Sequence, residues 1–439
     1  MSHARRTQRR HTWMRTLKLE ELEQRLLLNG DPGISSVQAS YSLADLDGTD
    51  GFVLEGIDEE DISGYSVSTA GDVNGDGYDD FVIGAPSADP DGNNNTGESY
   101  VVFGKSESFG TSVDLSTLNG STGFVLKGVD PGDQSGISVS SAGDVNGDGY
   151  NDILIGANLA DPGGTLSAGK TYVVFGKASG FTESVNLSLL DGTTGFVLNG
   201  IDDTDNSGQA VATAGDVNGD GYSDILIGAR MADYSEEYTG TGESYLIFGR
   251  ASGFSASVDL SSLDGVSGTV FNGLIGNDSL IGFSVSTAGD VNGDGYADIL
   301  IGAAWADFLL GVNTGAAYVV FGQTNGFGES LDLASLDGTK GFVLKGVDAG
   351  DYTGASVNSA GDINGDGYDD ILIGAKQADP DGDTDAGETY VVFGKSGSFG
   401  ASLDLSSLDG TNGFVLEGID ASDYSGSSVS TAGDVNGDG

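Results

Sequence analysis

A nine-residue string that returns at regular intervals constrains the fold more than any other feature of the chain. Its first aspartate recurs every 72 residues, with a single interval of 74. Self-similarity at a fixed period indicates a repeat architecture, in which each unit packs against the next one. We therefore expect five complete units and a sixth partial unit. The complete copies read Asp-(Val/Ile)-Asn-Gly-Asp-Gly-Tyr-X-Asp and occupy residues 72–80, 144–152, 216–224, 290–298 and 362–370.

Each copy places side-chain oxygens at the offsets that a calcium-binding loop uses. In the first copy, Asp72, Asn74 and Asp76 stand at positions 1, 3 and 5. Tyr78 can offer its backbone carbonyl at position 7, and Asp80 closes the set at position 9. Hard oxygen ligands in this order match the first nine positions of an EF-hand loop and suit Ca²⁺. We predict about one Ca²⁺ for each complete repeat; a simple turn is the alternative, because Asn-Gly and Asp-Gly also favour turns.

The same positions in the other copies supply the remaining predicted calcium ligands. Position 12, a glutamate in an EF-hand, is Ile83 in the first copy and lies in an apolar run. We therefore expect the loop to connect two β-strands instead of two helices. The ligands in the later copies are Asp144, Asn146, Asp148, Tyr150, Asp152, Asp216, Asn218, Asp220, Tyr222, Asp224, Asp290, Asn292, Asp294, Tyr296, Asp298, Asp362, Asn364, Asp366, Tyr368, Asp370, Asp434, Asn436 and Asp438.

Composition excludes several classes of function. The chain has no cysteine, and its two histidines, His3 and His11, lie near the N-terminus. The repeats therefore have no thiol nucleophile and no histidine general base, and we expect no enzymatic activity. A net charge of −50 should repel nucleic acids and anionic membranes, so we expect neither as a partner.

Residues 1–34 form a segment distinct from the repeats. It lacks the apolar core of an ordinary secretory signal, and no run in the chain approaches the roughly 20 apolar residues that a membrane-spanning helix needs. Leu19, Leu22 and Leu26 have helical spacing, which predicts a short amphipathic helix. Alternatively the segment is an export or surface-protein leader, because LEELEQRLLLNGD (19–31) resembles the LEPR-x-LL segment of large bacterial surface proteins.

From residue 41 to residue 439, the repeat unit reads as four short β-strands. In the first unit they occupy 66–72, 80–86, 99–105 and 123–128. Four short strands per repeat, stacked on neighbouring repeats, predict an all-β fold, a β-propeller with one four-stranded blade per unit. The piece at 42–56 matches a fourth strand without its first three, so we expect it to complete the last blade and close the ring. A chain that ends inside its sixth blade would leave the ring open, and its unpaired edges would favour self-association.

The units resemble FG-GAP repeats, the blades of the integrin α-subunit propeller and of many bacterial extracellular proteins. The resemblance rests on SVSTAGDVNGDGYDDFVIGAP (66–86) and GESYVVFG (97–104). It implies a seven-bladed propeller with calcium in the loops between first and second strands. It also implies a binding or adhesive role, with the ligand on the opposite face. The family's Phe-Gly pair ahead of the first strand is Ser63-Gly64 in the first unit.

The loop between the second and third strands varies most from unit to unit, which is typical of a binding surface on a rigid scaffold. In the fourth unit this loop is apolar on an otherwise acidic body. We predict a ligand contact there; the alternative is that these side chains fold back over their own blade. The residues are Trp305, Phe308, Leu309 and Leu310.

Paired aspartates open the connection into the first strand of most units, for example Asp58 with Asp61 and Asp130 with Asp133. Asx turns explain such pairs, and secondary cation sites are the alternative. The fourth unit lacks the pair.

These features together predict a calcium-binding propeller module of an exported or cell-surface bacterial protein that binds a protein or glycan partner. One alternative is a non-catalytic propeller of a larger secreted enzyme that acts on glycans or lipids, with its catalytic domain beyond residue 439. A second alternative is a structural matrix component.

Overall fold

The computed structural model describes residues 43–48, 51–178, 180–233, 240–273, 279–307, 312–324 and 326–433. Residues 47–433 form one compact unit that contains the strands of the described chain. Within these residues, no helix has the length and apolar character needed to cross a membrane. Three sequence predictions fall outside the described residues: the N-terminal segment 1–34, the loop residues Phe308, Leu309 and Leu310, and the sixth loop with Asp434, Asn436 and Asp438.

The described chain is all-β, and its strands repeat in one order along the units. The first strands are β2 (Ser66–Gly71), β7 (Ser138–Gly143), β12 (Ala210–Gly215), β17 (Ser284–Gly289) and β22 (Ser356–Gly361). The second strands are β3 (Asp80–Ala85), β8 (Asp152–Ala157), β13 (Asp224–Ala229), β18 (Asp298–Ala303) and β23 (Asp370–Ala375). The third strands are β4 (Glu98–Val102), β9 (Lys170–Val174), β14 (Glu243–Ile247), β19 (Ala316–Val320) and β24 (Glu388–Val392). The fourth strands are β6 (Gly123–Lys127), β11 (Gly195–Asn199), β16 (Gly268–Asn272), β21 (Gly341–Lys345) and β26 (Gly413–Glu417).

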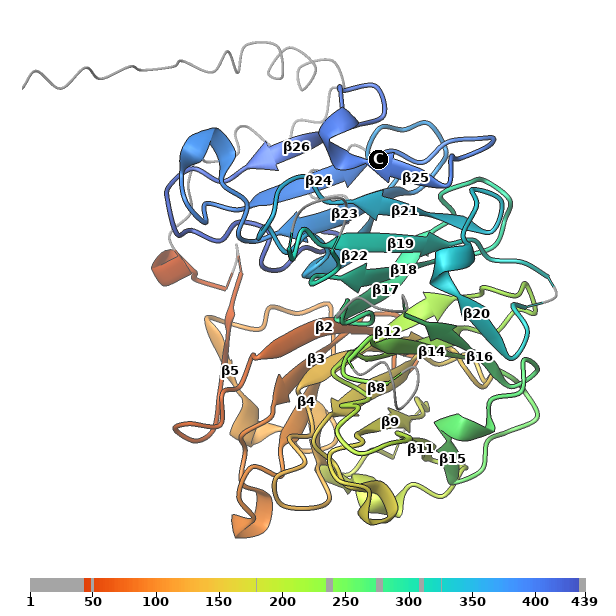
Figure 1. Cartoon of the computed structure of the whole chain (residues 1–439). Helices are drawn as coiled ribbons and strands as arrows, with labels where there is room; N and C mark the ends of the chain where they lie inside the picture. The colour runs from red at the N-terminus through yellow and green to blue at the C-terminus, as the bar shows by residue number, and fades with distance from the viewer. Residues whose placement is uncertain are drawn as a thin grey trace, which may run out of the picture. The chain divides into compact units, whose positions relative to one another are not determined.

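Within each unit the four strands pair antiparallel in chain order, which confirms the predicted four-strand repeat. In the second unit β7 pairs with β8, β8 with β9, and β9 with β11. Figure 1 shows the same order across the sheet that contains β17, β18, β19 and β21. A register shift between Ser141 and Gly143 places a β-bulge at the end of β7, directly before the nine-residue loop.

Four of these sheets have a fifth strand, which the prediction of four-stranded blades missed. The connection between third and fourth strands runs parallel to the fourth strand of the preceding unit; β10, for example, lies beside β6. The sequence Ser-Val-Asn-Leu at 184–187 alternates polar and apolar residues as such a strand does, but the run is too short to identify a strand by itself. The extra strands are β5 (Ser112–Asp114), β10 (Ser184–Asn186), β15 (Ser257–Asp259), β20 (Ser330–Asp332) and β25 (Ser402–Asp404).

Short 3-10 helices follow the extra strands and also occur in the second–third loops. Each helix after an extra strand buries its first leucine, such as Leu187. These helices are η3 (Leu115–Thr117), η5 (Leu187–Leu189), η6 (Leu260–Ser262), η7 (Leu333–Ser335) and η9 (Leu405–Ser407). Those in the second–third loops are η2 (Pro90–Gly92), η4 (Pro162–Gly164) and η8 (Pro380–Gly382), and η1 (Leu43–Asp45) precedes β1 in the sequence.

The predicted fourth strand near the start of the repeats is present as β1 (Val53–Glu55). It pairs in parallel with β5 in the register that β6 uses with β10, with Val53 beside Ser112 and Val125 beside Ser184. The piece therefore takes the place of a fourth strand. Ring closure with a last blade and a total of seven blades stay predictions.

The hydrophobic core lies between successive sheets. Phe124 of the first unit clusters with Ile153, Ile155 and Leu187 of the second unit, and the same arrangement recurs between later units. The first strands of consecutive units, from β2 through to β22, lie next to one another. Because each core draws on two units, a single unit cannot bury its apolar faces by itself.

The extra strands make a testable contribution to stability through their buried leucines. Leu187 is 2% exposed, whereas Leu189, in the same 3-10 helix, is 73% exposed. We expect Leu187→Ala to lower the free energy of unfolding by about 2–5 kcal/mol, since it leaves a cavity between two sheets. Leu189→Ala is the matched control and should change it by less than about 0.5 kcal/mol. Urea unfolding measures both; equal effects would contradict this packing role.

Candidate functional site

The nine-residue loops connect the first and second strands of each unit, and their side chains fold around the turn. In the second copy, Asp144 Oδ1 accepts the N–H of Gly147 (2.7 Å) and its Oδ2 accepts the N–H of Gly149 (2.9 Å). Both glycines have positive φ, 75° and 90°, which other residues adopt only with strain. Asn146 Oδ1 accepts the N–H of Asp148 (2.8 Å). The structure therefore brings the predicted ligands at positions 1, 3 and 5 together on one turn.

The ninth-position aspartate lies at the base of the loop and is fully buried in all five copies. Asp152 Oδ2 accepts the N–H of Val145 in the loop (3.0 Å), and its Oδ1 accepts the N–H of Gly176 (2.9 Å). Gly176 follows the third strand, so this carboxylate joins the loop to a different part of its sheet. The other four copies make the same two bonds.

Each loop concentrates negative charge around this buried carboxylate. Burial raises the pKa of Asp152 to about 8, against the lowering effect of the N–H bonds from Gly176 and Val145. The charges of Asp148 and Asp144 raise this pKa further. No lysine or arginine occurs in the nine residues to balance the carboxylates, which number three in the second, third and fourth copies and four in the first and fifth.

The donor set of the loops fits Ca²⁺ in chemical type. It consists of carboxylate, amide and backbone carbonyl oxygens, without nitrogen or sulfur donors. As the side chains stand, no group of three or more acidic side chains in the described residues converges closely enough to hold a metal ion. The carboxylates at positions 1 and 9 accept backbone N–H groups in this arrangement. Carboxylate oxygens can accept more than one bond, so these contacts do not exhaust them. Calcium binding stays a prediction.

The tyrosine at position 7 has a second role that the sequence did not indicate. A Cβ on Gly75 would lie 2.4 Å from Cε1 of Tyr150, so the Tyr150 ring covers the preceding loop. The same contact joins Gly147 to Tyr222 and the two later pairs of loops. Nearby, the N–H of Lys177 donates to the carbonyl of Val73 (2.9 Å). Each of the first four loops is thus held by the unit that follows it.

Of the four residues predicted to contact a ligand, the structure describes Trp305. Its side chain is 42% exposed. Its ring lies edge-on to Tyr352 at a centroid distance of 5.9 Å, and the Tyr352 hydroxyl accepts from Asn313 Nδ2 (3.3 Å). Sequence reasoning missed Tyr352, which comes from the connection into the fifth unit. The two aromatic rings form a partly exposed pair at the end of the sheet opposite the nine-residue loops.

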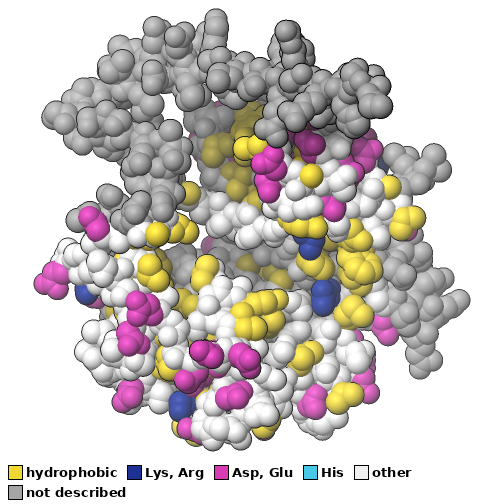
Figure 2. Space-filling model, turned by 90° about the vertical axis from the view of Figure 1, so that its left-hand side faces the viewer, with side chains coloured by type: hydrophobic (Ala, Val, Ile, Leu, Met, Phe, Trp, Pro, Cys, Tyr) yellow, Lys and Arg dark blue, Asp and Glu magenta, His cyan; other side chains and the backbone are white. Residues whose placement is uncertain are grey.

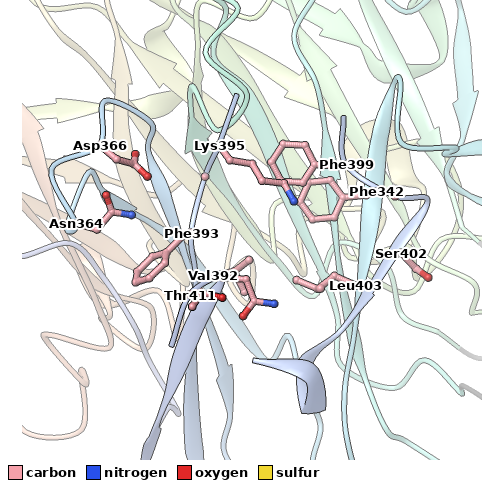
Figure 3. A pocket seen from close by; sticks show the side chains of 13 residues that line it. Phe342, Asn364, Asp366, Val392, Phe393, Lys395, Phe399, Ser402, Leu403 and Thr411 are labelled. Atoms are coloured by element: carbon pink, nitrogen blue, oxygen red, sulfur yellow. The ribbon is translucent and has the colours of Figure 1, made fainter. Parts of the chain in front are cut away.

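The surface agrees with the acidic composition, and one cavity lies beside the fifth nine-residue loop. The face in Figure 2 shows many acidic side chains and few basic ones. A cavity of about 500 Å³ lies on the flank of the fifth unit, with Asp366 on one side and the stacked rings of Phe342 and Phe399 on the other (Figure 3). In earlier units the next tyrosine covers this place, as Tyr368 covers Gly293. We therefore assign this cavity to contacts between units and not to a ligand.

Comparison with known proteins identifies the repeats. The FG-GAP repeat family matches residues 63–102, 135–174, 207–247, 282–320 and 347–392. Integrin alpha pat-2 of Caenorhabditis elegans is 31% identical over 61% of this chain and 20% of its own length. Integrin alpha-PS2 of Drosophila melanogaster is 30% identical over 64% of this chain and 18% of its own length.

A relative of a different kind shares the repeats. The phosphatidylinositol-glycan-specific phospholipase D of Bos taurus is 33% identical over 39% of this chain and 19% of its own length. The chain thus spans about a fifth of the length of these relatives. The matched residues coincide with the sheets and loops described above, and this chain belongs to the FG-GAP repeat family, with five repeats of the integrin α-like kind.

Proposed function

We propose that this chain is a calcium-stabilised FG-GAP module of an exported or cell-surface protein, and that it binds a protein or glycan partner. The contrast between the two ends of each sheet carries the proposal. At one end the five nine-residue loops are nearly identical, as a shared structural ligand requires. At the other end the loops differ in length and apolarity, as recognition of one partner requires.

Calcium would be held in each loop by the side chains at positions 1, 3, 5 and 9 and by the carbonyl at position 7. The ion supplies positive charge to a turn with three or four carboxylates, on a chain whose net charge is −50. Asp152 and its equivalents would link the bound ion to the sheet, because they already accept an N–H from the second residue after the third strand.

The relatives support a binding role for this chain, and one of them supports the alternative that the repeats belong to a larger enzyme. Two of them are named integrin α chains, and we propose an integrin-like, extracellular placement for this chain. The phospholipase D relative favours the alternative of a non-catalytic propeller in a larger lipid- or glycan-active enzyme. That alternative requires that the native protein cleave such a substrate and that loss of the repeats mainly change its KM. A structural matrix component remains the third candidate, and it requires no discrete ligand.

Calcium removal is the first test. A site formed only in the folded chain adds about 2.7 kcal/mol of stability when Ca²⁺ exceeds Kd 100-fold, and five sites should add several times this. We expect Tm to rise by at least about 10 °C between excess chelator and millimolar Ca²⁺. Mg²⁺ at equal ionic strength is the control, because it relieves charge repulsion without fitting the loop. Equal Tm values in Ca²⁺ and chelator would contradict the proposal.

The loops should also lose calcium one at a time. Asp220→Ala removes the position-5 carboxylate of the third loop, so equilibrium dialysis should show about one Ca²⁺ fewer per chain. Asp264→Ala removes an exposed aspartate of the same unit and should leave the number unchanged. Loss of all calcium from Asp220→Ala would show a cooperative ring of sites instead of separate units.

The exposed aromatic pair should contribute to partner binding. On glycan and matrix-protein arrays, we expect the calcium-loaded chain to retain a partner and Trp305→Ala to weaken it about 30-fold, the loss of ~2 kcal/mol typical of an aromatic anchor. Leu189→Ala, which removes a 73% exposed leucine elsewhere, is the control. Normal binding by Trp305→Ala would place the contact on other loops, and no binding by the unaltered chain would favour the matrix role.

A further inference from the structure

One backbone arrangement recurs at the end of the sheets opposite the nine-residue loops, while its side chains vary. The residue two places before the glycine of each connection has a positive φ, 55° for Tyr352. Its N–H donates to a carbonyl of the preceding second–third loop, as Tyr352 donates to Asn313 (3.3 Å). A constant backbone with changing side chains is typical of a recognition position. The equivalent residues with positive φ are Ile62, Gln134, Asn206, Leu280 and Tyr424.

At the boundary between the fourth and fifth units, two aromatic rings and an amide meet at this place. Trp305 is 42% exposed, and its ring lies edge-on to the partly buried Tyr352. Asn313 Nδ2 donates to the Tyr352 hydroxyl (3.3 Å), and Asp307 fixes the loop by accepting the Asn313 N–H (2.7 Å). The Tyr352 hydroxyl can still donate its proton, and the Asn313 amide can both donate and accept. Two rings and two polar groups of both kinds therefore share one exposed place.

The other units act as natural variants of this trio. In the fifth unit Gln377 stands at the position of Trp305, and its Nε2 donates to Asp385 of the same loop (3.1 Å). Tyr424 there takes the place of Tyr352 and is also 42% exposed. That boundary thus keeps one exposed tyrosine without the second ring. In units one, two and three, the residues equivalent to Trp305 are Ser87, Leu159 and Met231.

The fourth unit also lacks charged side chains at two positions that carry them elsewhere. The residue before Trp305 is Ala304, whereas the third and fifth units have Arg230 and Lys376 there. The trio itself is uncharged, on a chain whose net charge is −50. An anionic ligand would find no cation at these positions and would be repelled by the chain. The third strand begins with Ala316 in the fourth unit and with Glu98, Lys170, Glu243 and Glu388 in the others.

We infer that Trp305, Asn313 and Tyr352 form a binding site for a neutral glycan. This inference rests on the proposed function and narrows its partner to an uncharged carbohydrate. The C–H face of a sugar ring packs on an aromatic ring, and its hydroxyl groups both donate and accept hydrogen bonds, as the amide and the phenol do. Small-ligand sites combine aromatic surface with a few placed polar groups in this way.

Titration calorimetry with neutral oligosaccharides of glucose, mannose, galactose and xylose tests the inference on the calcium-loaded chain. We expect at least one of them to bind, and Trp305→Ala to weaken it about 30-fold and Tyr352→Ala about tenfold, as truncation of aromatic anchors does. Tyr424→Ala removes an equally exposed tyrosine at the next boundary and is the matched control, with no expected change. The affinity should not depend on salt, because no charges pair, and uronic acid oligosaccharides should bind more weakly.

Transfer of the trio to the next boundary gives a test by gain of binding. The loop backbone is the same there, because Asp379 accepts the N–H of Asp385 (2.7 Å) as Asp307 does for Asn313. The double change Gln377→Trp with Asp385→Asn places a ring and an amide beside Tyr424. We expect it to create a second site and to increase the oligosaccharide bound per chain.

The outcomes separate this inference from the proposed function. Failure of all four neutral oligosaccharides to bind, or equal binding by folded Trp305→Ala and Tyr352→Ala, would overturn the inference. Tyr352→Phe, which keeps the ring, should weaken binding less than Tyr352→Ala, and it replaces that variant if Tyr352→Ala does not fold. Retention of a protein on the arrays, weakened by salt, would overturn the glycan site but leave the binding role intact. A chain that retains no partner of either class would contradict both.

Discussion

The buried aspartate at the ninth loop position is the interaction on which each unit depends. Its two carboxylate oxygens hold an N–H inside the loop and an N–H beyond the third strand, as Asp152 does for Val145 and Gly176. A hairpin loop and a separate strand end are therefore fixed by one side chain in a place that water does not reach. Removing it would leave two backbone donors buried without acceptors, which costs more than a surface hydrogen bond returns. Every complete unit therefore keeps a buried carboxyl group, despite the cost of its desolvation, to join the loop to the end of the third strand.

The repeat period and the spacing of apolar residues were enough to predict the four antiparallel strands and the position of the loops. They did not reveal the fifth strand, because three residues such as Ser184–Asn186 form too short an alternating run to stand out from a connection. Only its parallel partner in the preceding unit makes it a strand. Likewise, the contact between Trp305 and Tyr352 joins two units, and a reading of one unit at a time cannot find it. The ligand positions 1, 3 and 5 were predictable because their spacing is local; the inward bonds of position 9 were not.

The charged residues near the buried acids differ from one unit to the next, although the chain as a whole is acidic. At the end opposite the nine-residue loops, burial raises the pKa of Asp133 in the second unit and Lys170 lowers it, whereas the fourth unit has Ser279 in place of that aspartate. Near-identical strands thus carry different electrostatic environments at one end. Differences between copies of a repeat inform on function in the way that a mutant series does, because the scaffold around the varied position stays constant.

The tyrosine that covers the preceding loop gives the boundaries between consecutive units the same contact. Tyr150 lies on Gly75, Tyr222 on Gly147, and the following pairs repeat the contact. A crossover between two copies of the gene segment, one period apart, would delete or add a whole unit. At the new boundary, the tyrosine of one loop would still pack on the glycine of the loop before it. The length of such an array can therefore change during evolution without inventing a new interface, and recognition can diversify in the loops while the boundaries stay fixed.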